Sequence, residues 1–136
     1  MDRRDFVMTC AAAGAALLAG CASLVTHPVP MAAGRVRLTL SQYPDLTRGD
    51  GAIKILPQGQ DDPIYVLASG EEFIAVSPIC THRGCTVDVH GLRLVCPCHG
   101  STYSRDGTVL KGPAQRALTR FPVSRVGDAL EIRIAS

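Results

Sequence analysis

The chain has 136 residues, of which 46% are hydrophobic, so it is long enough for one domain with a packed core. Aromatic residues make up only 4% and tryptophan is absent, so aliphatic side chains must fill most of that core. The formal net charge of +2, without a stripe of Lys or Arg, excludes nucleic-acid binding through a basic surface. Of the six cysteines, Cys10 and Cys21 lie in an N-terminal apolar stretch, whereas the other four crowd between positions 80 and 98. This second group marks the candidate site.

Residues 1–21 have the pattern of an export signal or membrane anchor, because charged residues precede an apolar run that ends in small residues. The pair Arg3-Arg4 with Phe6 resembles a twin-arginine signal, and the end of the run, Leu18–Cys21, resembles a lipoprotein box with Cys21 as the lipidated residue. Cleavage there would leave a lipid-anchored domain, whereas an uncleaved run of about 20 residues would span a bilayer as one helix. An ordinary cleaved signal with an incidental Cys21 is the third alternative. All three place the domain outside the cytoplasm, on the periplasmic side of a bacterial membrane.

The rest of the chain predicts an all-β domain that follows a flexible tether. Residues 22–35 are rich in Pro, Ala and Gly and are typical of a tether, so the domain is expected over residues 36–136. Alternating apolar residues and Gly- or Asp-containing turns predict short strands after residue 35. The predicted strands are Val36–Leu40, Ile53–Leu56, Ile64–Leu67, Phe73–Val76, Thr86–Val89, Leu92–Val95, Thr108–Leu110, Leu118–Val123 and Leu130–Ile134.

Two short segments carry Cys and His, which are residue types that bind metals. The first reads C-T-H-R-G-C over residues 80–85 and the second C-P-C-H-G-S over residues 96–101. The segment Thr86–Val95 between them predicts a hairpin that turns at His90-Gly91, and a hairpin brings its two ends together. Both segments are therefore expected at one tip. Two Cys and two His in facing loops would also suit a tetrahedral zinc ion, which remains the alternative from another class of protein.

The paired segments resemble the two cluster boxes of Rieske [2Fe–2S] proteins, in the disulfide-containing, high-potential branch of that family. The resemblance covers about Ile53 to Val126. It implies a Rieske-type fold of small antiparallel sheets, with a cluster-binding subdomain of loops and a hairpin at about residues 78–115. It also implies a [2Fe–2S] cluster with Cys on one iron and His on the other. The implied ligands are Cys80, His82, Cys96 and His99, and the implied disulfide joins Cys85 to Cys98.

The resemblance extends to residues around the second box. Ser101 and Tyr103 occupy positions where that branch has hydroxyl donors, the Ser to a bridging sulfide and the Tyr to a ligand Cys sulfur. Such donors stabilise the negative charge of the reduced cluster, which predicts a reduction potential in the upper half of the Rieske range. The segment Gly112-Pro113-Ala114 resembles the start of the proline loop that shields the cluster.

The function that the resemblance implies is one-electron transfer in a membrane-associated redox chain outside the cytoplasm. Three arrangements are expected as alternatives: a quinol–cytochrome c reductase subunit, a subunit of an arsenite-oxidase-type molybdenum enzyme, or a stand-alone carrier. The redox partner is accordingly a cytochrome, a molybdenum subunit or quinol. Arg83 and Gln115 depart from the quinol-oxidising pattern. No residue is placed for bond chemistry on a substrate, so any enzyme activity would belong to a complex. The export pattern and the extra Cys pair disfavour a cytoplasmic ferredoxin of a dioxygenase.

Overall fold

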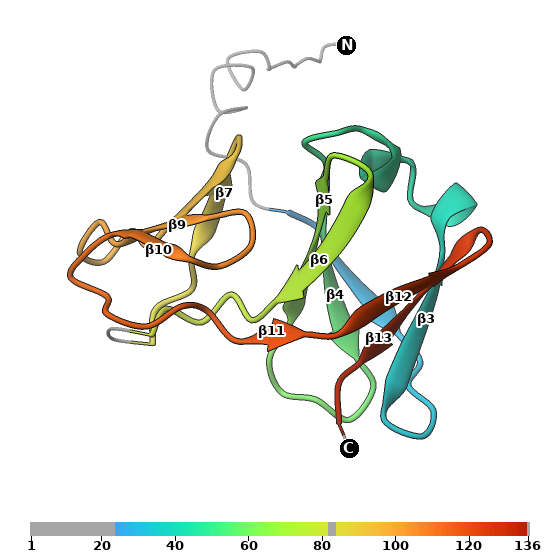
Figure 1. Cartoon of the computed structure of the whole chain (residues 1–136). Helices are drawn as coiled ribbons and strands as arrows, with labels where there is room; N and C mark the ends of the chain where they lie inside the picture. The colour runs from blue at the N-terminus through green and yellow to red at the C-terminus, as the bar shows by residue number, and fades with distance from the viewer. Residues whose placement is uncertain (1–23, 82–83, 136) are drawn as a thin grey trace, which may run out of the picture.

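The computed structural model describes residues 24–81 and 84–135, and these residues form strands with two short 3-10 helices (Figure 1). The predicted export segment with Cys21, and the predicted ligand His82, lie outside the described residues. The all-β prediction is confirmed. The strands are β2 (Thr26–Val29), β3 (Arg35–Thr39), β4 (Ala52–Pro57), β5 (Ile64–Ser69), β6 (Glu72–Val76), β7 (Asp88–His90), β8 (Arg93–Val95), β9 (Thr102–Ser104), β10 (Val109–Lys111), β11 (Arg120–Phe121), β12 (Val123–Val126) and β13 (Ala129–Arg133). The 3-10 helices are η2 (Leu40–Gln42) and η3 (Pro44–Thr47).

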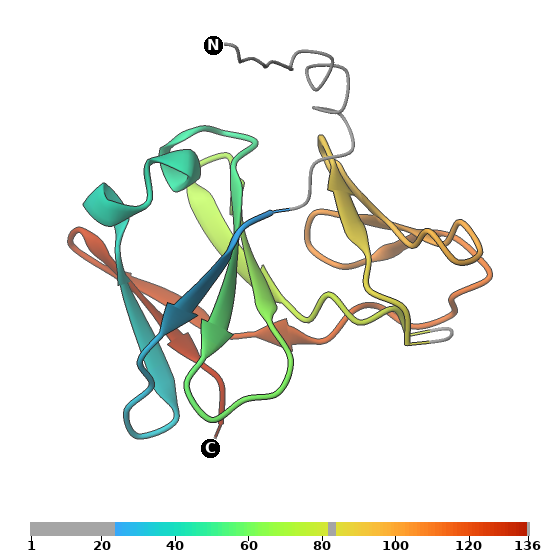
Figure 2. The same cartoon turned by 180° about the vertical axis from the view of Figure 1, so that it is seen from behind.

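Two sheets pack together to form the part of the domain that we call the base. One sheet has the order β11-β6-β5-β4-β2 and the other the order β12-β13-β3 (Figures 1 and 2). In β3 and β13 the predicted alternation is observed, because apolar side chains such as Val36 and Leu130 are buried while charged ones face outward. Arg37 and Glu131, opposite each other on the outer face, form an ion pair at 2.8 Å.

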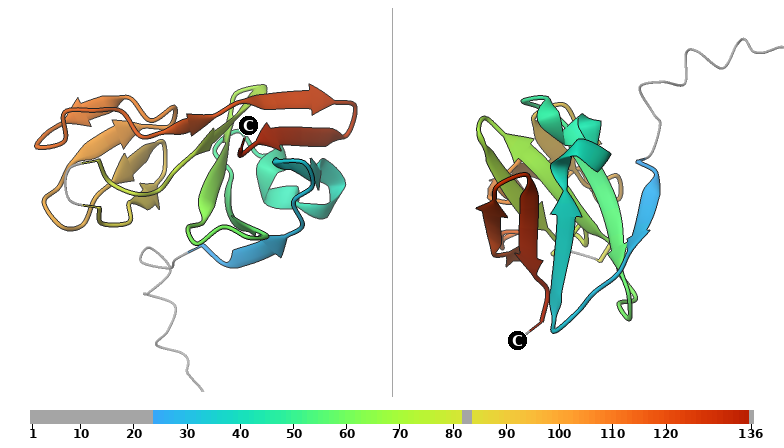
Figure 3. Two further views of the ribbon diagram at one scale, coloured as in Figure 1. Left: turned by 90° about the horizontal axis from the view of Figure 1, so that it is seen from below. Right: turned by 90° about the vertical axis from the view of Figure 1, so that its right-hand side faces the viewer.

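A second unit, the hairpin subdomain (residues 78–115), carries the sheet β10-β9-β8-β7. It lies beside the base in Figures 1 and 2 and in the left view of Figure 3, and the chain enters it after β6 and leaves it before β11. The two connecting segments are joined by the backbone N–H of Ser77, which donates to the carbonyl of Thr119 at 2.8 Å. The predicted hairpin is confirmed, since β7 pairs antiparallel with β8. Its turn is Gly91-Leu92, one residue later than expected, because His90 is the last residue of β7 and lies opposite Arg93.

Strand β5 is buried on both faces, which explains why its sequence Ile64–Ser69 does not alternate. Ile64 and Val66 belong to the core between the two sheets of the base. Tyr65 and Leu67, on the opposite face, belong to the core of the hairpin subdomain. The sheet that contains β5 is therefore a shared middle layer, and the hairpin subdomain is fixed against it by apolar burial.

Three elements differ from the sequence-based expectation. Thr26–Val29, within the expected tether, forms β2, which pairs in parallel with β4 and buries Val29. The expected strand Leu118–Val123 is divided at Pro122 between β11 and β12, which belong to different sheets. Strand β9, which immediately follows the second Cys/His segment, was not expected as a strand. Among residues 24–81 and 84–135, none of the helices has the length and apolar character needed to cross a membrane.

Tyr65 supplies a polar contact between the two units. Its hydroxyl donates to the carbonyl of Val87 at 2.6 Å, in a buried setting. Burial, and secondarily the negative charge of Asp88, raises the pKa of Tyr65 from 10.0 to about 12. A pKa that is higher in the folded state means that the stabilisation is complete below about pH 10 and is lost as the pH rises toward 12.

Replacing Tyr65 by Phe is therefore expected to lower the free energy of unfolding by about 1 kcal/mol near neutral pH. The wild type should also lose stability more steeply than Tyr65→Phe as the pH rises above about 10, because only the wild type has this phenol to ionise. Denaturant unfolding at a series of alkaline pH values measures both effects, with Tyr43→Phe as the control. Parallel pH profiles for the wild type and Tyr65→Phe would contradict the assignment.

Candidate metal centre

The two Cys/His segments form loops with the same backbone hydrogen bonds. In the first, the N–H of Cys80 donates to the carbonyl of Cys85 at 2.6 Å and the N–H of Gly84 to the carbonyl of Cys80 at 2.9 Å. In the second, Cys96 donates to Ser101 at 2.8 Å and Gly100 to Cys96 at 2.9 Å. The same pair of hydrogen bonds, at the same spacing, thus occurs on either side of the β7–β8 hairpin.

Glycine is required in each loop by backbone conformation. Gly84 has φ of +78° and Gly100 has φ of +80°, in the left-handed region that other residues rarely adopt. A Cβ added at either position would meet no atom within 4 Å, so the requirement comes from the backbone angle and not from lack of space.

The loops bring the thiols of Cys80 and Cys96 together inside the hairpin subdomain. Their exposed fractions are only 2% and 1%, and both belong to its apolar core. Burial raises the pKa of Cys96, and contact with the Cys80 thiol raises it further, whereas backbone N–H groups of Cys98 and His99 lower it. Two buried sulfurs in contact, with N–H donors aimed at one of them, form a site where a cation would stabilise the thiolates.

The other two cysteines form a disulfide. Cys85 in the first loop is bonded to Cys98 in the second, across 13 positions of sequence, which is the pairing that the resemblance implied. The Sγ atom of Cys96 lies within 4.8 Å of both disulfide sulfurs. The disulfide and the pair of buried thiols therefore lie next to each other, and both connect the first loop to the second.

Tyr103 places a hydroxyl against the Cys80 sulfur. Its side chain is fully buried, and its oxygen lies 3.2 Å from the Sγ of Cys80 and 3.2 Å from the Oγ1 of Thr81. The Tyr103 oxygen also accepts the N–H of Thr81 at 3.3 Å. Since a thiolate is a stronger acceptor than a hydroxyl, the Tyr103 hydrogen is directed to the sulfur once Cys80 is deprotonated. Burial, followed by the contact with Cys80, raises the pKa of Tyr103, so the phenol remains a donor.

The segment Gly112-Pro113-Ala114 lies against the second loop. Ala114 is buried, and its N–H donates to the buried hydroxyl oxygen of Ser101 at 3.0 Å. Because that oxygen accepts from Ala114, the hydroxyl hydrogen of Ser101 is available to another acceptor. Sequence reasoning missed Thr81, whose hydroxyl donates to the carbonyl of Arg116 at 2.7 Å and so ties the first loop to the segment after Ala114. No local pattern marks this contact.

The predicted ligands of the second loop differ in exposure. His99 is exposed to solvent, whereas Cys96, three residues earlier, is buried. The structure thus brings together Cys80, Cys96 and the second loop that carries His99, while the position of His82 lies outside the described residues.

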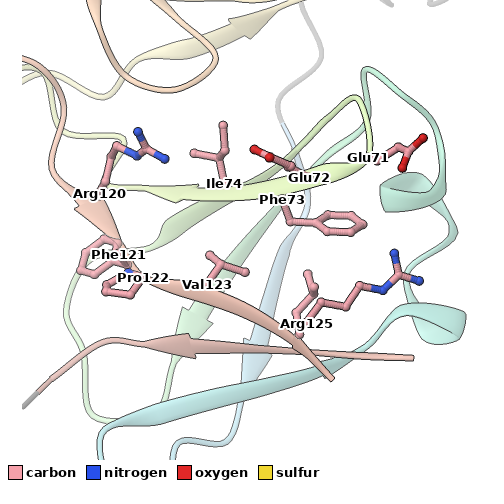
Figure 4. Close-up of a pocket in the computed structure, with 10 residues that line it drawn as sticks. Glu71, Glu72, Phe73, Ile74, Arg120, Phe121, Pro122, Val123 and Arg125 are labelled. Atoms are coloured by element: carbon pink, nitrogen blue, oxygen red, sulfur yellow. The ribbon is translucent and has the colours of Figure 1, made fainter. Parts of the chain in front are cut away.

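A separate cavity of about 500 Å³ lies between β6 and the β11–β12 segment of the base (Figure 4). Its lining includes Phe73, Phe121 and Arg120, and no residue of the two Cys/His segments contributes to it. This cavity is therefore separate from the candidate metal centre.

These features define a class of site: a pair of buried cysteine thiols with a tyrosine hydroxyl against one of them, an exposed histidine on the second loop, and a disulfide between the two loops. A family model described as the Rieske [2Fe–2S] domain matches residues 42–122. The chain belongs to the Rieske [2Fe–2S] domain family. Its cofactor is accordingly a [2Fe–2S] cluster, and the buried pair of thiols fits that cofactor. The family match does not favour the zinc alternative.

The similar proteins include iron–sulfur subunits of cytochrome b6-f complexes. That of Chlorobaculum tepidum is 35% identical over 100 residues, which are 72% of this chain and 54% of that subunit. That of Trichodesmium erythraeum is 42% identical over 83 residues, which are 57% of this chain and 46% of that subunit. This chain therefore spans about half the length of the curated relatives it matches.

Solved structures show the same fold. The cyanobacterial plasma membrane Rieske protein PetC3 of Synechocystis PCC 6803 superposes with a TM-score of 0.55 at 33% identity, covering 66% of this chain and 92% of that one. The ferredoxin of carbazole 1,9a-dioxygenase from Nocardioides aromaticivorans gives 0.59 at 20% identity, covering 76% of this chain and 100% of that one. The second likeness shows the fold alone.

Breaking the disulfide with Cys98→Ser is expected to destabilise the loaded protein by up to about 3 kcal/mol, because the two loops lose their covalent link. The effect should be smaller than that of closing a free loop of this size, since the cluster joins the same loops. Loss of visible absorbance during denaturant unfolding measures it.

Cys85→Ser should reproduce the result, and the double variant should be no less stable than either single variant, since all three lack one bond. A wild-type unfolding midpoint for Cys98→Ser would contradict a structural role for the disulfide.

Proposed function

We propose that this protein transfers one electron at a time through a Rieske [2Fe–2S] cluster, with Cys80 and Cys96 bound to one iron and His82 and His99 to the other. When bound, the cluster accepts one electron and returns it without forming or breaking bonds in a substrate. The observation that carries the proposal is the pair of loops with matching hydrogen bonds, which place two buried thiols in contact at the open end of one hairpin.

The surrounding residues have distinct parts in this proposal. Tyr103 donates to the sulfur of Cys80, and Ser101 donates from its buried position to a cluster sulfur. Both hydroxyls favour the reduced state because they stabilise added negative charge. The segment Gly112-Pro113-Ala114 covers the second loop and excludes water from it, as the burial of Ala114 and its bond to Ser101 support. The exposed side at His99 is the edge that a redox partner approaches.

We further propose that the protein acts outside the cytoplasm and is held at a membrane by its N-terminal segment. The twin-arginine-like pair, the apolar run and Cys21 support export with a lipid or helical anchor. The names of the relatives, iron–sulfur subunits of cytochrome b6-f complexes and a plasma membrane Rieske protein, support a membrane redox chain. The partner in this proposal is a cytochrome or a molybdenum-enzyme subunit, or quinol.

Replacing any one of Cys80, Cys96, His82 or His99 is expected to abolish the Rieske cluster as measured by iron and acid-labile sulfide content, visible absorption and the electron paramagnetic resonance spectrum after reduction. Cys→Ser and His→Gln are suitable changes because they remove the soft or imidazole ligand with little change in size. His90→Gln is the matched control, since His90 is exposed next to the turn of the hairpin and should leave all signals intact. A wild-type spectrum in His99→Gln, or no sulfide in the wild type, would refute the proposed centre.

Tyr103→Phe is expected to lower the midpoint potential while preserving the cluster. Losing a hydrogen bond that is stronger in the reduced state by about 1 kcal/mol corresponds to about 45 mV for one electron. Voltammetry of the purified domain measures the shift. Tyr65→Phe is the control, because its hydroxyl bonds the carbonyl of Val87 rather than a sulfur, and its potential should remain close to that of the wild type. Equal potentials for Tyr103→Phe and the wild type would contradict the hydrogen bond to the cluster.

A further inference from the structure

Arg105 is a buried cation that joins the hairpin subdomain to the base. It follows directly after β9, and its exposed fraction is only 6%. Its Nε donates to the carbonyl of Ala68 at 2.9 Å and its Nη2 to that of Gly51 at 2.6 Å, both in the base. Its Nη1 donates to the carbonyl of Gly91, in the turn of the β7–β8 hairpin, at 2.7 Å. One planar guanidinium thus binds three carbonyls that are distant in sequence.

The charge of Arg105 is not neutralised by a direct ion pair. Within the described parts of the chain, its three hydrogen-bond acceptors are uncharged carbonyls and no carboxylate lies within ion-pair distance. Burial lowers the pKa of Arg105, and the charge of Asp50 opposes that effect. A guanidinium stays protonated even when buried, so a positive charge persists in the protein interior.

This cation follows closely after Tyr103, the residue of β9 whose hydroxyl contacts the Cys80 sulfur. Tyr103 in β9 and Arg105 in the turn after it are two positions apart and are both buried. The acceptors of its guanidinium lie in the base and at the hairpin turn, so the charge is further from the sulfur of Cys80 than the Tyr103 hydroxyl is. In an interior of low polarity, a buried charge acts over longer distances than a charge in water, with little screening by salt.

The hairpin is held at both ends against a single strand of the base. At the start of β7, the carbonyl of Val87 accepts from Tyr65, and at the turn, the carbonyl of Gly91 accepts from Arg105. Tyr65 and Ala68, the partners in the base, both belong to β5. The open end of this hairpin carries the two Cys/His loops, so its orientation on β5 sets their orientation on the base.

We propose that Arg105 is a positioning residue for electron transfer: it fixes the β7–β8 hairpin on β5, and its buried positive charge favours the reduced state of the centre. The proposal rests on the proposed function, since it assigns to this chain a determinant of that centre's potential. The two effects are separable, because the first needs the three-pronged guanidinium and the second needs only a positive charge.

Three variants separate these effects. Arg105→Gln removes charge and most of the bonds, and Arg105→Lys keeps the charge but not the fork that reaches three carbonyls. Arg125→Gln is the control, with the same change in net charge at an exposed side chain. Each is purified with its cluster and studied by voltammetry at low and high salt, and by hydrogen exchange of the amides in Asp88–Val95.

We expect Arg105→Gln to lower the midpoint potential by an amount that high salt leaves largely unchanged, whereas Arg105→Lys stays near the wild-type potential. Amide exchange in the hairpin should be faster in both variants. Arg125→Gln should change neither the exchange nor the potential at high salt, because water and ions screen an exposed charge.

The proposal is overturned if Arg105→Gln keeps the wild-type potential, or if Arg105→Lys lowers it as much as Arg105→Gln does. Wild-type exchange in both Arg105 variants would overturn the role in fixing the hairpin. Should Arg105→Gln not fold, Arg105→Lys alone decides: faster exchange at an unchanged potential supports the proposal, and a lowered potential refutes it. A wild-type protein without a [2Fe–2S] spectrum would instead refute the proposed function.

Discussion

Antiparallel pairing of β7 with β8 is the constraint on which the metal centre depends. The first Cys/His segment precedes β7 and the second follows β8. The pair of Asp88 and Val95 holds the two strands together at the end of the hairpin that is next to both segments. Both links between the loops, the Cys85–Cys98 disulfide and the contact of Cys80 with Cys96, span this pairing. A slip of one residue in β8 would turn Leu94 outward and Arg93 inward, and would separate the loops as well. The register of a six-residue pairing thus determines whether four sulfur atoms meet.

The position of this hairpin is determined in turn by the middle layer of the base. Strand β5 contributes Ile64 and Val66 to one core and Tyr65 and Leu67 to the other, so neither unit has a complete core without it. A domain this small buries too little surface to stabilise two independent units. The hairpin subdomain therefore takes its stability and its orientation from the sheet behind it, and the polar contacts of Tyr65 add specific geometry to that apolar contact.

Features that depend on local sequence patterns could be predicted, whereas features that depend on contacts between distant parts of the chain could not. Alternation predicted β3 and β13 because each has one buried face. The two Cys/His segments were expected to meet because the hairpin between them has a short, local turn. Strand β2 was missed because Pro28 and Pro30 are typical of a tether. Proline is nevertheless tolerated at the edge of a sheet, where β2 lies beside β4.

Arg105 could not have been found from its neighbours in sequence. A charged residue in an Arg-Asp-Gly turn is typical of the surface, and its three carbonyl partners come from Gly51, Ala68 and Gly91. Only the tertiary arrangement brings them together. The roles expected for Ser101 and Tyr103 came from the family resemblance, and the structure adds their burial and their contacts with Ala114 and Cys80.

An electron carrier must stabilise an added charge and must also release it to a partner, and uniform burial would serve the first requirement at the expense of the second. The described residues resolve this conflict by asymmetry. Cys80 and Cys96 are buried, with the Tyr103 hydroxyl against the first sulfur and backbone N–H groups against the second. On the other side of the second loop His99 is exposed, where imidazole brings the proposed centre within reach of solvent and a partner. In the proposed arrangement, the cysteine side sets how strongly the electron is held and the histidine side sets how readily it leaves. The hairpin, fixed on β5, keeps both sides at its open end.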